Sequence, residues 1–213
     1  MPNTIKAIIF DNHGVLQLGK YSLVTFRRHR DLSVHHFMAK SFHINLDQWF
    51  DAIDTPYADA IVGKIAKEQA LHIMAKNLDT TPKHLEHLFI KAYKKHFRRN
   101  NILHRVAFRL KRKGYKIAIL SDQWPVSKEA LISKEDLKKF NEAVISCDVK
   151  YRKPVPVIYH VVLKRLGVLP HEAVFIDNQK WNILPARHLG MHAILFSNNW
   201  QTLRALRKLG VKL

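Results

Sequence analysis

The sequence is short of acidic residues, of cysteine and of long apolar runs, and each shortage excludes something. It has 17 Asp and Glu against 36 Lys and Arg, a formal net charge of +19 with histidine neutral. Such an excess attracts anions, whether phosphorylated metabolites, nucleic acid or anionic membrane, and it concerns partners rather than the fold. Cys147 is the only cysteine, so the chain cannot form an internal disulfide.

The apolar runs are soon interrupted by charge, so none is long enough to span a bilayer, and we expect no membrane partner. The first ten residues lead into a strand-like run without the apolar core or cleavage site of a signal peptide. With the single cysteine, this indicates a cytoplasmic protein, and we expect a monomer or a homodimer. Apolar residues still make up 47% of the 213 residues, enough for one packed domain with a smaller appendage.

Short apolar segments that alternate with helical periodicity run through most of the chain. The segment 156–166 places Ile158, Val162 and Leu166 on one helical face and ends at Gly167, a typical helix stop. Alternation of this kind predicts an α/β fold, a doubly wound parallel sheet with helices on both faces. The five strands are expected at 6–10, 116–120, 142–146, 173–176 and 192–196.

The alternation stops once, between the first and second expected strands. Roughly 80–100 residues there have no strand signal, far more than an ordinary connection needs. The segment has apolar stripes at helical spacing, and Thr81-Pro82 has the form of an N-cap followed by a first-turn proline. We therefore expect an inserted helical domain over residues 17–99, with the α/β core formed by residues 1–16 and 100–213.

Polar residues follow the carboxyl ends of several expected strands, where parallel α/β sheets bind their ligands. Asp11 follows the first strand, Ser121 the second and Asp177 the fourth, and Lys153 lies a little beyond the third. Two carboxylates that face each other repel unless a cation lies between them, and Mg²⁺ is the oxygen-seeking ion expected there. Ser121 and Lys153 are suited to hold the remaining charge of a tetrahedral anion such as phosphate.

Four segments in this order resemble the motifs of the haloacid dehalogenase-like (HAD) superfamily, in the subgroup with a helical cap between the first two motifs. They are IIFDNHGVL at 8–16, IAILSD at 117–122, YRKPVPVIYHVVLKRLGVLP at 151–170 and VFIDNQKWNILPARHLGMHAILF at 174–196. In the insert, VGKIAKEQAL is similar to the start of a cap helix in that subgroup. The resemblance covers essentially the whole chain. It implies a Rossmann-like core with a helical cap and a Mg²⁺-dependent phosphatase that acts on a small phosphorylated metabolite.

The resemblance also implies a role for each residue. Asp11 would be the nucleophile that forms an aspartyl-phosphate, while Ser121 would bind a phosphoryl oxygen and Lys153 would neutralise charge. Backbone N–H groups around Asn12 and Gly14 would line the phosphate site. The expected catalytic residues are Asp11, His13, Ser121 and Lys153, the substrate-binding residues are Asn12, Gly14, Ser121 and Lys153, and the Mg²⁺ ligands are Asp11, the His13 backbone carbonyl and Asp177, with Asn178 nearby.

His13 is the main departure from the family pattern, because phosphatases of the family carry a second acid there. That acid protonates the leaving group and later helps to activate water, and its loss costs roughly 10²–10⁴-fold in rate. An imidazole with an ordinary pKa near ~6.5 can take both roles, so we expect an active but slower phosphatase.

Two alternatives stay open. The first is a 2-haloacid dehalogenase: such enzymes also lack the second acid, but they replace the acids of the fourth motif, whereas Asp177 remains here. The second is a catalytically weak HAD-like protein that binds polyanions or nucleic acid. It rests on eleven Lys and Arg between positions 91 and 116, with no Asp or Glu among them, although no specific nucleic-acid recognition signature is present. The run Arg27, Arg28, His29 and Arg30 is a candidate for binding a second anionic group of the substrate.

Overall fold

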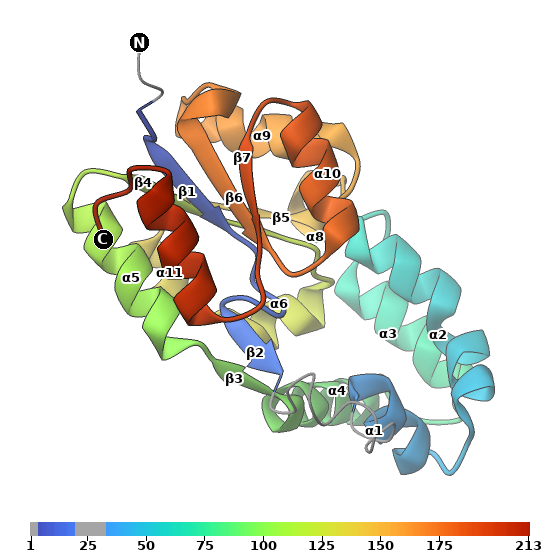
Figure 1. Ribbon diagram of the computed structural model, residues 1–213. Coiled ribbons are helices and arrows are strands. Elements are labelled where there is room, and N and C mark those ends of the chain that lie inside the picture. The colour runs from blue at the N-terminus through green and yellow to red at the C-terminus, as the bar shows by residue number, and fades with distance from the viewer. Residues whose placement is uncertain (1–3, 20–32) are drawn as a thin grey trace.

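A computed structural model describes residues 4–19 and 33–213 and centres on a five-stranded parallel sheet (Figure 1). The strand order is β5-β4-β1-β6-β7. The expected doubly wound α/β fold is confirmed, and each expected strand is present within one residue of its predicted ends. The strands are β1 (Ala7–Phe10), β4 (Lys116–Ser121), β5 (Glu142–Ile145), β6 (Ala173–Asp177) and β7 (His192–Leu195).

Strand β1 is apolar at every position because both of its faces and both of its edges are covered. Ala7 aligns with Lys116 of β4 on one side and with Ala173 of β6 on the other. Ile8 packs into a core on one face of the sheet, and Ile9 packs into a second core on the opposite face. The chain therefore emerges at Asp11 from the centre of the molecule.

Helices cover both faces of the sheet. One core contains side chains of α5 (Asn101–Arg112) and α11 (Asn199–Lys208), and the other contains side chains of α9 (Pro156–Leu166) and α10 (Lys180–His188). Shorter elements complete the sheet's surroundings. They are α6 (Pro125–Leu131), α7 (Lys134–Lys139), α8 (Ser146–Val149) and the 3₁₀ turn Pro170–Glu172.

The inserted segment is helical, as expected. Its helices are α1 (Val34–Ser41), α2 (Leu46–Ile61), α3 (Lys67–Asn77) and α4 (Pro82–His96). The predicted cap is present at the start of α4, where the Thr81 hydroxyl accepts a hydrogen bond from the His84 N–H at 3.2 Å. The helices share a hydrophobic cluster centred on large buried side chains such as Trp49 and Phe89.

The same cluster takes in residues that follow β4, so the insert and the sheet domain are packed together. Trp124 lies fully buried within it and donates a hydrogen bond from Nε1 to the Tyr93 hydroxyl at 2.8 Å. Gly63 lies against the Cys147 carbonyl so closely that a Cβ would come within 2.2 Å of the oxygen. The domain boundaries at 17 and 99 stay a prediction.

The expectation that the inserted segment contains no strand was wrong. Gln17–Gly19 forms a strand, β2, that pairs antiparallel with β3 (Phe97–Arg99) where the chain leaves and re-enters the sheet domain. Each strand has only three residues, too few to show an alternating pattern, and its partner lies about 80 positions away. Local periodicity therefore could not predict this pair. The run Arg27–Arg30 lies outside the described residues. None of the described helices combines the length and the apolar character that a membrane crossing requires.

An ion pair fastens β3 to the sheet domain. The Arg99 guanidinium donates from Nε to Asp136 Oδ2 at 3.0 Å and from Nη2 to Oδ1 at 2.8 Å. Burial alone would raise the pKa of Asp136, but the Arg99 hydrogen bonds and the nearby His104 outweigh it and lower the pKa. The buried His104 ring lies 3.5 Å from the same carboxylate, and burial, followed by the Arg99 charge among other effects, lowers its pKa.

We expect acidification to lower the free energy of unfolding through His104. The unfolded chain binds a proton on this residue near pH ~6.5, whereas the folded protein resists protonation to lower pH, so stability falls as pH drops below that value. Urea unfolding at pH 7.5 and 5.5 measures the change. His104→Gln should lose less stability between the two pH values than the wild type, and exposed His171→Gln should behave like the wild type. Equal losses in all three proteins would contradict this account.

Candidate active site

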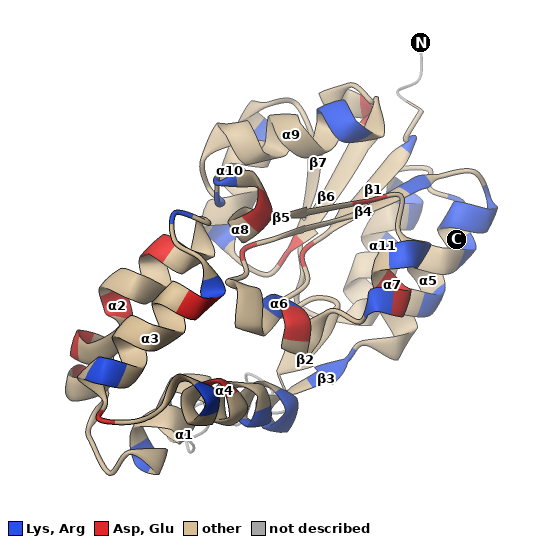
Figure 2. Cartoon of the chain, turned by 180° about the vertical axis from the view of Figure 1, so that it is seen from behind, with Lys and Arg blue, Asp and Glu red and all other residues tan. Residues whose placement is uncertain are grey.

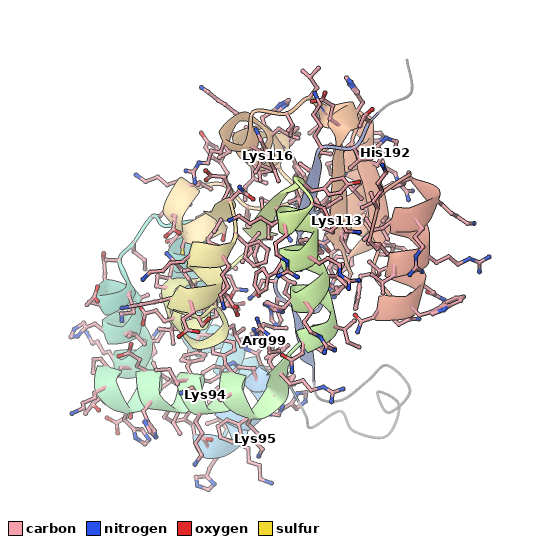
Figure 3. All side chains as sticks on the ribbon, turned by 90° about the vertical axis from the view of Figure 1, so that its left-hand side faces the viewer. Lys94, Lys95, Arg99, Lys113, Lys116 and His192 are labelled. Carbon is pink, nitrogen blue, oxygen red and sulfur yellow. The ribbon has the colours of Figure 1, made fainter. Side chains whose placement is uncertain are left out.

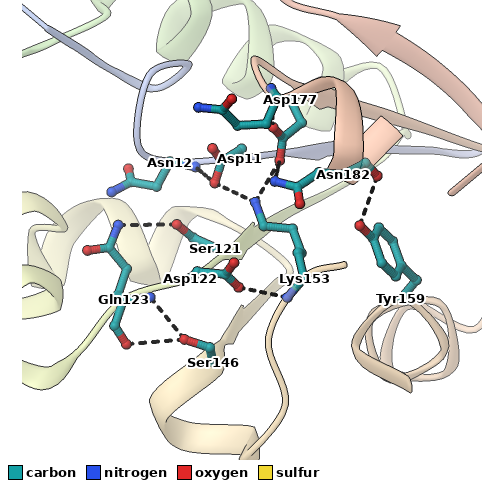
Figure 4. A network of polar contacts seen from close by, with 11 residues as sticks. Asp11, Asn12, Ser121, Asp122, Gln123, Ser146, Lys153, Tyr159, Asp177 and Asn182 are labelled. Atoms are coloured by element: carbon teal, nitrogen blue, oxygen red, sulfur yellow. Dashed lines mark hydrogen bonds and ion pairs between the residues drawn. The ribbon is translucent and has the colours of Figure 1, made fainter. Parts of the chain in front are cut away.

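The carboxyl ends of three neighbouring strands bring the expected site residues to one edge of the sheet (Figure 4). Asp11 follows β1, Ser121 ends β4 and Asp177 ends β6. Lys153 comes from the loop after α8. All four side chains are buried, with exposures of 4% or less, so the sheet holds a polar group inside its own core.

Lys153 bridges the two carboxylates. Its Nζ lies 2.9 Å from Asp11 Oδ1 and 2.6 Å from Asp177 Oδ2. Burial alone would lower the pKa of the ammonium, but Asp11 and Asp177 outweigh that effect and raise it well above its usual value. Lys153 is therefore charged, and it holds together the carboxylates at the ends of the paired strands β1 and β6.

Asp11 has one oxygen engaged and one available. Its Oδ1 accepts hydrogen bonds from the Asn12 N–H at 2.8 Å and from Lys153. Its Oδ2 accepts no hydrogen bond from any residue that the structure describes. Burial raises the pKa of Asp11 to about 7, Lys153 opposes that rise, and Asp177 and Asp122 add to it. The carboxylate is therefore held through one oxygen, while the other is not engaged by a described residue.

Asp177 is held by more donors than sequence analysis indicated. Its Oδ1 accepts from the Gln179 N–H at 2.7 Å, and its Oδ2 accepts from Asn182 Nδ2 at 3.0 Å as well as from Lys153. Asn182 was missed, although its place in the first turn of the helix that follows Asp177 was a usable signal. The Tyr159 hydroxyl donates to the Asn182 carbonyl at 2.8 Å and so ties α9 to this turn.

Gln123 is a second residue that sequence analysis missed. Its Nε2 donates to Ser121 Oγ at 3.2 Å, and its backbone N–H donates to Ser146 Oγ at 3.0 Å. Because Ser121 Oγ accepts this bond, its own hydroxyl hydrogen stays available to donate to a ligand. Asp122 Oδ1 accepts a hydrogen bond from the Lys153 backbone N–H at 3.0 Å, which helps to position the lysine.

The loop after Asp11 depends on Gly14. Its φ of +94° lies in the region that favours glycine, and a Cβ there would come within 2.5 Å of the Asn178 amide. The His13 ring packs edge-on against Phe97 at a centroid distance of 4.3 Å. His13 is an exposed residue, but desolvation by the surrounding protein, followed by the charges of Lys153 and His35, lowers its pKa to about 4. The ring is therefore neutral at neutral pH.

The donor set around Asp11 suits a hard cation. Within the described residues no three His, Cys, Asp or Glu side chains gather as a metal site, so carboxylates alone do not form one. Asn178 Oδ1, however, is buried without a hydrogen-bond partner, and the His13 carbonyl accepts no hydrogen bond from a described residue. With Asp11 and Asp177 these groups form an all-oxygen set, the type that Mg²⁺ prefers. The roles of all these residues stay predictions.

We expect Gly14→Ala to lower the free energy of unfolding by about 1–3 kcal/mol more than Gly114→Ala. Both glycines have nearly the same positive φ, +94° and +91°, so both variants carry the strain of a side chain at positive φ. Only at position 14 does the added Cβ meet another residue, since nothing lies within 4 Å of a Cβ at position 114. Urea unfolding of the two variants measures the difference. Equal destabilisation would show that the contact with Asn178 does not constrain this loop.

Comparison with curated proteins finds relatives of several activities. The chain is 27% identical over 231 residues to bifunctional epoxide hydrolase 2 of Sus scrofa, covering 98% of this chain and 40% of that protein. It is 36% identical over 96 residues to glyceraldehyde 3-phosphate phosphatase of Methanothermobacter thermautotrophicus, covering 42% of this chain and 40% of that protein. It is 32% identical over 87 residues to (S)-2-haloacid dehalogenase 4A of Burkholderia cepacia, covering 40% and 38%.

The fold has relatives among solved structures. A HAD family enzyme from Bacteroides thetaiotaomicron, in complex with magnesium and inorganic phosphate, superimposes with a TM-score of 0.73 at 19% identity, covering 93% of this chain and 98% of that one. A family model for haloacid dehalogenase-like hydrolases matches residues 5–190. The helical-cap subgroup stays a prediction. Because the matched residues span most of the sequence, including the parallel sheet up to β6 and the helical insert, this chain belongs to the haloacid dehalogenase-like hydrolase family.

Proposed function

We propose that the protein is a Mg²⁺-dependent phosphatase that hydrolyses a small phosphorylated metabolite through an aspartyl-phosphate on Asp11. The observation that carries this proposal is the second buried carboxylate, Asp177, which shares the single ammonium of Lys153 with Asp11. Three acids (Asp11, Asp122 and Asp177) face one lysine here. A buried group with this excess of negative charge suits a divalent cation and disfavours an anionic substrate without one.

The residues that would hold Mg²⁺ are Asp11, the His13 carbonyl and Asp177, with Asn178 Oδ1 nearby. Bound Mg²⁺ would supply positive charge that draws the phosphoryl group toward Asp11 and screens their repulsion. Lys153 holds Asp11 Oδ1, which leaves Oδ2 as the nucleophile. Ser121 donates its hydroxyl hydrogen to a phosphoryl oxygen. Asn12 Nδ2, buried without a partner among the described residues, is a second donor suited to the same anion.

The reaction has two displacements at phosphorus. In the first, Asp11 Oδ2 forms a bond to phosphorus while the bond to the substrate oxygen breaks, and the departing oxygen takes up a proton. In the second, water attacks the aspartyl-phosphate, the bond between phosphorus and Asp11 breaks, and inorganic phosphate leaves. His13 follows Asp11 by two residues, and its neutral ring would accept a proton from the attacking water in the second step. The departing oxygen of the first step would take its proton from solvent.

The dehalogenase alternative has less support. Relatives named as phosphatases and as dehalogenases match this chain at similar identity, so the comparisons do not separate the two activities. Displacement of a halide from carbon by Asp11 needs no second carboxylate, and the dehalogenases that the sequence resembles carry small polar residues in its place. Asp177 therefore favours phosphoryl transfer.

We expect Asp11→Asn to abolish hydrolysis of a generic aryl phosphate, because an amide cannot act as the nucleophile. Asp177→Asn should reduce the Mg²⁺-stimulated rate by at least 100-fold, whereas Asp148→Asn, at an exposed acid, should leave it unchanged. Release of the phenol, measured with and without chelator, follows all four proteins. Chelator-resistant halide release from a 2-haloacid, with no phosphate hydrolysis, would instead establish the dehalogenase alternative.

His13→Asp should raise the rate of the same hydrolysis by about 10–100-fold, because it restores the acid that the family's phosphatases use for proton transfer. The exposed His160→Asp is the matched control, since it makes the same change of charge on α9. Initial rates at saturating substrate compare the two variants with the wild type. A His13→Asp protein no faster than the wild type would show that proton transfer at this position does not limit the reaction.

A further inference from the structure

We propose that the outer face of α5 and α11 is a binding surface for single-stranded nucleic acid, separate from the Asp11 site. The chain has two long segments without Asp or Glu, residues 87–121 and 178–213. They carry eleven and six Lys and Arg, respectively. The first contains α5 and the second contains α11, so the fold decides whether the two sets of charges meet.

Hydrogen bonds at both ends show that the two helices lie side by side and run in the same direction. At their N-terminal ends, Asn100 Nδ2 donates to Asn199 Oδ1 at 2.8 Å and Asn199 Nδ2 donates back to Asn100 Oδ1 at 3.1 Å. At the other end, Lys113 Nζ donates to the Leu213 oxygen at 2.7 Å. Figures 1 and 2 show this pair from opposite sides.

Exposed cations line both helices and the residues that follow them. On α5 they recur at helical spacing, and on α11 they occupy one turn, so each helix presents them as a stripe. None of them forms an ion pair with an acid that the structure describes. The eight residues are Arg105, Arg109, Arg112, Lys113, Arg204, Arg207, Lys208 and Lys212.

The basic surface extends beyond the ends of the helices. A cavity of about 770 Å³ at their C-terminal ends is lined by Lys6, Lys113, Lys116 and Lys212 among others. Of these lysines, Lys6 pairs with an acid, Glu172. Figure 3 follows the labelled cations of the first acid-free segment from Lys94 at one end to Lys116 at the other. On the opposite flank, α7 carries Glu135 and Asp136, and Arg99 already engages Asp136.

This surface also carries an exposed aromatic side chain, Trp200, which a face that only contacts solvent would not require. It lies in the first turn of α11 and keeps 65% of its surface exposed. The Arg204 guanidinium lies 5.4 Å from the centre of its ring, and Ile102 at the start of α5 is also exposed. An exposed aromatic ring within a positive field is the arrangement on which unpaired bases stack while lysine and arginine hold the phosphates.

The apolar sides of the helices argue against a membrane as the occupant. Leu103, Leu110 and Leu206 point into the core of the sheet domain and are buried, so beyond the single exposed side chains Ile102 and Trp200 neither helix has an apolar face to insert into lipid. The 12 residues of α5 extend about 18 Å. That length suits a few nucleotides of a single strand, whose phosphates supply the complementary charge.

Two variants with equal change of net charge test the proposal. In one, Arg105, Arg109, Arg204 and Arg207 are replaced by Gln; in the other, Lys164, Arg165, Lys180 and Arg187, on the opposite side of the sheet, are replaced by Gln. Fluorescence anisotropy with a labelled 12-mer of oligouridylate gives the affinity over a series of salt concentrations. We expect the first variant alone to lower the slope of log K against log salt, by about 3, since each phosphate contact contributes about 0.7.

Trp200→Ala should weaken binding of the oligonucleotide by about 5- to 150-fold, with Trp200→Phe intermediate, and should leave binding of heparin, which has no bases, unchanged. Thermal melting and aryl-phosphate hydrolysis verify that each variant is folded. If both quadruple variants weakened binding of the oligonucleotide equally, the effect would depend on net charge alone and the proposal would be overturned. Binding to phosphatidylserine vesicles without binding to the oligonucleotide, or an unchanged affinity in Trp200→Ala, would overturn it as well.

Discussion

The buried ammonium of Lys153 is the group on which the site depends. It joins Asp11 at the end of β1 to Asp177 at the end of β6, two carboxylates that would repel each other in the interior of the protein. Its own backbone is fixed by Asp122 beyond β4, so three neighbouring strands are linked through one residue. This arrangement leaves Asp11 Oδ2 without a hydrogen bond from a described residue, and it sets three acids against one lysine, an imbalance that a divalent cation would reduce.

The helical insert connects to the sheet domain next to Asp11. The chain leaves the sheet domain immediately after the loop that carries Asp11 and returns through β3, paired with β2. Trp124, three residues beyond Ser121, is buried in the hydrophobic cluster of the insert, which couples the packing of the insert to the residues after β4. Trp124 directly follows Gln123, the residue whose side chain donates to Ser121 Oγ.

The proposed hydrolysis and the proposed nucleic-acid surface use different parts of the positive charge. At the carboxyl edge of the sheet, the single ammonium of Lys153 faces three acids, Asp11, Asp122 and Asp177, despite the net charge of +19. On α5 and α11 the charge is positive throughout, because the two segments of the chain without acids pack against each other there. The net charge of the chain does not reveal this difference between the two regions, because it is the sum over both.

The sequence by itself determined the parallel sheet, its five strands and the helices around it, because short apolar runs and helical stripes are local patterns. It also placed Asp11, Ser121, Lys153 and Asp177 after strand ends, and sheet topology then requires them to share one edge. Only the tertiary structure decided the β2–β3 pair, the hydrogen bond that joins Gln123 to Ser146, and the juxtaposition of α5 with α11. Each of these depends on contacts between residues far apart in the sequence, which local pattern does not relate.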